Sequence, residues 1–160
     1  MTDLQQRMAA VLRDDLFACS GRRLARAMHA SSVGDSAGYL YQFRYASKLM
    51  PDLDAMGDYH GSEMAFVFNV RYPMHAVVTK RDEQMVAAFG CFWSNLAHYG
   101  HPDGGDSAVD ACRALDAAPP AWPSPDEGLM AMEVPPSADD HQINDKCDQM
   151  DRIFEKYGHR

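Results

Sequence analysis

The sequence predicts an α/β fold that consists mostly of helices and contains only about two to three strands. Three stretches, near residues 4–28, 79–100 and 140–157, repeat their apolar residues at helical spacing. Aromatic side chains alternate along Tyr39–Tyr45, and a short apolar run covers 129–134, both typical of strands. We expect an incomplete sheet, because a doubly wound sheet needs strand partners on both sides.

Length and charge restrict the function. The 160 residues suit one domain, and contents of 46% hydrophobic and 24% charged residues are typical of a globular protein. A formal net charge of -8 argues against a nucleic-acid partner, because no basic stretch is present. The first fifteen residues lack the apolar core of a signal peptide, and the longest apolar run, Met85–Trp93, is too short to span a membrane. We therefore expect a soluble chain without a targeting signal.

The first helical stretch contains a candidate break. Apolar residues follow helical spacing up to Phe17, and Cys19-Ser20-Gly21 then interrupts the pattern. Ser20 is a candidate cap for a second helix that continues through Met28.

The second helical stretch has clear ends. Thr79 and Asp82 form a capping pattern, and Gly100 followed by Pro102 ends the helix. A weaker helical pattern lies around 109–115. The last helix, from Asp140, carries one apolar stripe: Ile143, Cys147, Met150, Phe154 and Tyr157.

His60 is the candidate catalytic residue. It lies on a loop between Gly57 and Gly61, and the acidic Glu63 and a short apolar run follow. A histidine held on such a corner can present its imidazole to a cleft as a general base. The alternative is a surface histidine beside a buried helix. Glu63 is interpreted as supporting, and Asp58 as capping the turn, because the orienting carboxylate of a triad normally comes from another loop.

Four stretches together resemble a known family. They are the block 57–69 with its His60-Gly61-Ser62-Glu63 core, the Tyr-Leu-Tyr-x-Phe strand at 39–43, the segment 92–103 and the pair Trp122-Pro123. In their order along the chain, these stretches resemble the C-terminal portion of type B carboxylesterases, the cholinesterase-like branch of the α/β-hydrolases. The resemblance implies that His60 is the proton shuttle of a Ser-His-acid triad that hydrolyses small carboxylic esters without a cofactor.

The same resemblance implies an incomplete enzyme. In the family, the nucleophile elbow and the triad acid lie upstream of anything that matches residues 1–160, so we expect the chain alone to be inactive. The alternative is a non-catalytic interaction module on the same scaffold. Helix faces and a strand edge that the rest of the fold would cover predict self-association or a partner.

Gly34-Asp35-Ser36-Ala37-Gly38 fits the G-x-S-x-G pattern of a nucleophile elbow. The elbow requires a strand before the serine and a helix after it, and here the predicted order is reversed. Ser36 is therefore a minor alternative as nucleophile.

The four cysteines lack C-x-x-C spacing, so zinc or thioredoxin-type chemistry is not expected. The resemblance implies a Cys19–Cys147 disulfide, and hence an oxidising, secreted or extracellular location. Cys91 and Cys112 have no assigned partner. His98, His101 and Asp103 are explained by a helix C-terminus rather than by a metal.

Overall fold

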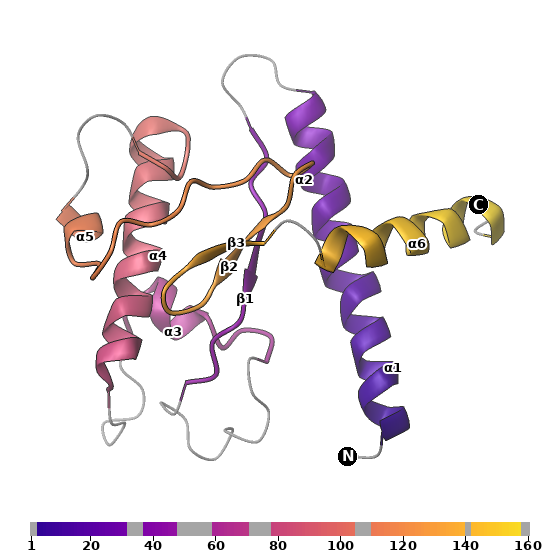
Figure 1. Cartoon of the computed structure of the whole chain (residues 1–160), viewed down its shortest axis with the longest axis horizontal. Helices are drawn as coiled ribbons and strands as arrows, with labels where there is room; N and C mark the ends of the chain where they lie inside the picture. The colour runs from indigo at the N-terminus through magenta and orange to yellow at the C-terminus, as the bar shows by residue number, and fades with distance from the viewer. Residues whose placement is uncertain are drawn as a thin grey trace. The chain divides into compact units, whose positions relative to one another are not determined.

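The fold is described from a computed structural model, over residues 3–31, 37–47, 59–70, 78–104, 110–139 and 142–157. The chain forms two compact units (Figure 1). Unit 1 comprises Met1–Leu40, Pro123–Leu129 and Asp139–Arg160, and unit 2 comprises Tyr41–Trp122 and Met130–Ala138. The expected fold class is confirmed, because the described residues are mostly helical and include a small, open three-stranded sheet.

Unit 1 begins with one continuous helical rod. It consists of α1 (Asp3–Arg13), a π-helical segment η1 (Asp14–Cys19) and α2 (Ser20–Ala30) (Figure 1). The expected break at Cys19-Ser20-Gly21 is wrong. Ser20 keeps helical dihedral angles, and its hydroxyl donates to the carbonyl of Asp15 at 2.9 Å instead of capping a new helix. The π-helical segment ends at Cys19 and α2 begins directly at Ser20, so the helix continues through the segment that the sequence pattern marked as a break.

Helix α6 (Gln142–Tyr157) is fastened to this rod. The Cys19–Cys147 disulfide is confirmed. The guanidinium of buried Arg22 contacts Asp148 at 2.7 Å and Asp151 at 2.8 Å. Burial raises the pKa of Asp151, but hydrogen bonds from Arg23 and Arg22 outweigh it and hold that pKa below its usual value. Of the expected apolar stripe, Cys147 is buried, whereas Phe154 and Tyr157 are exposed.

Unit 2 is built on a small sheet in the order β1-β2-β3. The strands are β1 (Tyr41–Phe43), β2 (Leu129–Met132) and β3 (Ser137–Asp139). β1 pairs with β2 in parallel, with Tyr41 opposite Met130 and Phe43 opposite Met132. β1 and β2 confirm the two expected strands, while β3 carries no hydrophobic pattern and was not expected.

Three helices accompany the sheet: α3 (Met64–Val67), α4 (Lys80–Tyr99) and α5 (Asp110–Arg113). α4 has the predicted ends, a capping box between Thr79 and Asp82 and a left-handed Gly100. α5 lies beside α4 (Figure 1) and is joined to it by a Cys91–Cys112 disulfide, the pairing that the sequence left unassigned.

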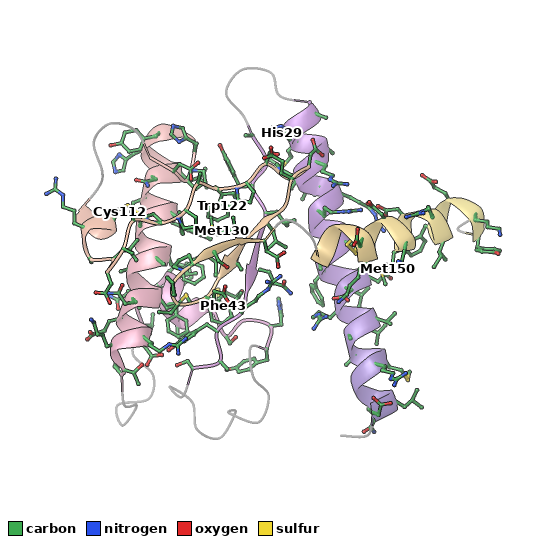
Figure 2. All side chains as sticks on the ribbon, viewed as in Figure 1. His29, Phe43, Cys112, Trp122, Met130 and Met150 are labelled. Atoms are coloured by element: carbon green, nitrogen blue, oxygen red, sulfur yellow. A yellow bond between two sulfur atoms is a disulfide. The ribbon has the colours of Figure 1, made fainter. Side chains whose placement is uncertain are left out.

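The core of unit 2 is aromatic. Phe43, Trp122 and Met130 come from separate parts of the chain and gather beside α4 (Figure 2). The ring of Phe89 on α4 lies 6.1 Å from Tyr41, 6.1 Å from Phe43 and 5.0 Å from Trp93. Such ring pairs add about 0.5–1.5 kcal/mol each beyond the burial of their area. The alternating aromatic residues of β1 thus face α4.

Truncation of this core is expected to destabilise unit 2. Phe89 is 1% exposed, so Phe89→Ala should lower the free energy of unfolding by about 3–5 kcal/mol through lost burial and a cavity. Both tryptophans lie in unit 2, so urea unfolding followed by tryptophan fluorescence reports on this unit. Leu96→Ala, on the same helix at a side chain 40% exposed, is the control and should cost about 1 kcal/mol or less. Equal losses in both variants would contradict the assignment of Phe89 to the core.

Candidate active site around His60

His60 is exposed and lies at the start of a tight turn that leads directly into α3. The turn is closed by its own hydrogen bonds. The backbone N–H of Ser62 donates to the carbonyl of Tyr59 at 3.0 Å, and the Ser62 hydroxyl donates to the same carbonyl at 2.6 Å. These two hydrogen bonds hold the residues on either side of the histidine together.

Gly61 determines the direction of this turn. Its φ of 89° lies in the left-handed region, where a side chain is unfavourable. Its carbonyl accepts the N–H of Met64 at 3.2 Å, and a Cβ placed on Gly61 would meet nothing within 4 Å. The glycine is thus required by backbone conformation and not by crowding.

α3 connects the histidine turn to the core. Phe66 is 2% exposed, and its ring centroid lies 5.7 Å from Phe43 on β1 and 5.6 Å from Tyr45. The backbone N–H of Phe66 donates to Glu63 at 2.9 Å. The exposed His60 is therefore only a few residues away from a side chain that the core holds firmly.

Glu63 lies at the cap position of α3 and makes no side-chain capping bond there. Its charge acts on β1 instead. Burial raises the pKa of the Tyr41 hydroxyl, and the negative charge of Glu63 raises it further. Tyr41 is consequently a neutral hydroxyl at physiological pH.

A buried carboxylate supports the same region. Asp82 is 2% exposed and accepts hydrogen bonds from the hydroxyls of Tyr45 at 3.1 Å, Ser47 at 2.7 Å and Thr79 at 2.6 Å. Burial raises the pKa of Asp82, but the hydrogen bonds from Thr79, Ser47 and Tyr45 outweigh it, so the pKa lies below its usual value. The sequence revealed the capping pair of Thr79 and Asp82 but not the two hydroxyls, which come from residues far away in the chain.

The sequence indicated two further candidates, a nucleophile and a carboxylate that caps a turn. Ser36 and Asp58 lie outside the described residues. Gly38, the last glycine of the elbow-like pattern, lies against α2, where a Cβ would stand 2.2 Å from the Ala25 carbonyl oxygen. Close packing on a helix therefore explains Gly38 without an oxyanion turn.

The aromatic and acidic residues after α4 have a structural role in this fold. The Asp103 carboxylate accepts the backbone N–H of Trp122 at 2.6 Å, and Asn95 donates to the carbonyl of Pro102 at 2.9 Å. Within the described ranges, no group of three or more His, Cys, Asp or Glu side chains is arranged to hold a metal ion. No described helix is long and apolar enough to cross a membrane.

Comparison with known proteins identifies the family. The profile of the carboxylesterase family matches residues 2–150. The chain belongs to the carboxylesterase family. A mouse cholinesterase is 31% identical over 70 residues, which make up 44% of this chain and 12% of the mouse protein. No solved structure matches the chain. The resemblance seen in the sequence is thereby confirmed for the carboxylesterase, cholinesterase-like family.

The conformation of Gly61 leads to a first prediction for this site. We expect Gly61→Ala to lower the thermal stability of unit 2 by about 1–2 kcal/mol, because a side chain disfavours the left-handed conformation. Gly21→Ala is the matched control, since Gly21 is helical and has room for a Cβ, and it should stabilise unit 1 by about 0.5–1 kcal/mol. Circular dichroism melts measure both changes, and a stabilising Gly61→Ala would rule out the left-handed turn.

The depressed pKa of Asp82 leads to a second prediction. Its ionised form stabilises unit 2 fully above the ordinary pKa of 3.8, and this stabilisation is lost as the pH falls through the lower folded-state pKa. Tryptophan fluorescence across pH 2–6 should therefore show a loss of stability below about pH 4 that Asp82→Asn reduces. An identical acid profile in the variant would contradict an ionised, hydrogen-bonded Asp82.

Proposed function

We propose that this chain provides the catalytic histidine for the hydrolysis of carboxylic esters, with His60 as general base. In this mechanism a serine hydroxyl attacks the ester carbonyl while the imidazole of His60 takes its proton. The imidazole then returns the proton to the leaving alcohol, and a carboxylate orients the ring. No cofactor is needed for these steps.

One observation carries the proposal. Within a chain of the carboxylesterase family, His60 is exposed on a turn that leads directly into a helix held in the core. This arrangement supports a general base, which needs an accessible imidazole on a rigid backbone. Small carboxylic esters are the proposed substrates because of the family to which the chain belongs.

The serine and the orienting carboxylate are proposed to lie outside residues 1–160, in an upstream portion of a carboxylesterase domain of which this chain is the catalytic-histidine portion. The modest share of the mouse cholinesterase that the match covers, 12%, supports this view. The chain by itself should then have negligible esterase turnover. A secreted or extracellular location is proposed as well, supported by the two disulfides and the family.

A second candidate is a non-catalytic, cholinesterase-like module that binds a partner or a second copy of itself. It is favoured by large apolar side chains that unit 1 leaves about half exposed or more. On the rod they are Leu4, Met8, Val11, Leu12, Leu16, Phe17, Leu24 and Met28, and on α6 they are Ile153, Phe154 and Tyr157.

The two candidates are separated by grafting. Residues 59–70 replace the corresponding histidine segment of a hydrolytically active member of the family, and hydrolysis of p-nitrophenyl acetate is measured. We expect the graft to retain activity and His60→Gln to lower kcat by at least about 10⁴-fold, because no base then accepts the serine proton. Grafting the same segment with Met64→Leu, at a side chain that is 50% exposed, keeps His60 and is the matched control, which should retain activity. Equal activity of the graft and its His60→Gln variant would refute the proposed base.

The 160-residue chain itself is tested with a phosphonate probe for serine hydrolases, read by intact mass. No adduct is expected. A stoichiometric adduct that Ser36→Ala abolishes would instead make Ser36 the nucleophile of a self-sufficient enzyme.

A further inference from the structure

The carboxylate of Asp82 makes two sets of contacts that serve different parts of unit 2. Its Oδ2 accepts hydrogen bonds from the backbone N–H of Thr79 at 2.8 Å and from the Thr79 hydroxyl at 2.6 Å, which caps α4. Its Oδ1 accepts from the hydroxyls of Tyr45 and Ser47, which lie 37 and 35 residues away in the chain. A helix cap requires only the first set. The second set therefore has another structural consequence.

Tyr45 and Ser47 lie shortly after β1, which ends at Phe43. Just before them, the backbone N–H of Arg44 donates to the carbonyl of Met132 at 2.9 Å, which continues the pairing of β1 with β2. The hydrogen bonds to Asp82 extend this fixed region beyond the end of the strand. The chain thus leaves the sheet in a position that α4 determines.

Tyr45 also contacts α3, the helix that follows the histidine turn. Its ring meets the ring of Phe66 edge to face, at 5.6 Å and 76°, and Phe66 is hydrogen-bonded to Glu63, three residues after His60. The guanidinium of Arg81 also lies over the Tyr45 ring, 5.8 Å from its centroid. Because Tyr45 is buried between these groups, the direction of its hydroxyl and the position of its ring are linked.

We propose that Asp82 is a positioning residue for His60, acting through the hydroxyl of Tyr45 and the contact of Tyr45 with Phe66. The inference rests on the proposed role of His60 as general base, since a general base acts only from a defined position. Asp82 itself does not touch the reacting atoms in this scheme. It contacts the residues that follow β1 directly and reaches the helix after the turn through one aromatic ring.

The test compares two neighbouring charges at the start of α4 in the 160-residue chain. Asp82→Asn and Glu83→Gln each remove one negative charge from the first turn, but only Asp82 contacts Tyr45 and Ser47. Asparagine keeps one acceptor oxygen and replaces the other with an NH2 group that cannot accept, so one of the two sets of hydrogen bonds made by Asp82 is lost. Two signals are read by NMR, the imidazole carbon–proton resonance of His60 and the hydrogen exchange of the Met64 and Phe66 amides.

We expect Asp82→Asn to shift the His60 resonance and to speed exchange at Met64 and Phe66 by about tenfold or more, because these amides close the turn and α3. Glu83→Gln should leave both signals within about twofold of the parent chain. The Gly100 amide, at the opposite end of α4, is the internal reference and should not change in either variant.

Tyr45→Phe provides a second, milder variant in case Asp82→Asn fails to fold. It keeps the ring against Phe66 and removes only the hydroxyl, and it should change the His60 and Phe66 signals in the same direction. The proposal is overturned if every folded variant of Asp82 and Tyr45 behaves like Glu83→Gln. Because no signal depends on hydrolysis, an inactive graft would refute the general base without affecting this result.

Discussion

The ring of Phe43 on β1 contacts both Phe66 on α3 and Phe89 on α4, and the position of the histidine turn depends on these two contacts. A four-residue helix has too few hydrogen bonds to be stable by itself. α3 therefore persists because Phe66 is buried in the aromatic core. The support of the histidine turn thus depends on that core.

Around this core, a buried carboxylate and a disulfide join α4 to its neighbours in unit 2. The Asp82 carboxylate joins the start of α4 to the residues that follow β1, and the Cys91–Cys112 disulfide joins the middle of α4 to α5. Unit 1 has the same arrangement in another form, because Arg22 and the Cys19–Cys147 disulfide connect the rod to α6. In each unit a disulfide joins a long helix to a shorter helix, and ionic or hydrogen-bonded contacts add to it. The pairs are the rod with α6 in unit 1 and α4 with α5 in unit 2.

The proposed role of His60 as general base makes the support of its turn functionally important. A general base contributes to hydrolysis only when its imidazole is held within a fraction of an ångström of its partners. The described structure supplies the backbone support for such a group, through Gly61, Phe66 and Tyr45. The rod and α6, by contrast, leave large apolar side chains exposed.

The sequence by itself determined the elements that depend on local patterns. The ends of α4 followed from Thr79 and Gly100, and β1 and β2 followed from their hydrophobic runs, because capping and periodicity act over a few residues. The resemblance to the family likewise rested on short motifs, and the family profile matches residues 2–150. The tertiary structure alone decided the contacts of Asp82 with Tyr45 and Ser47, the pairing of Cys91 with Cys112 and the continuity of the rod through Ser20. Each of these depends on which distant or competing partners come together in the folded chain, and local spacing does not encode that choice.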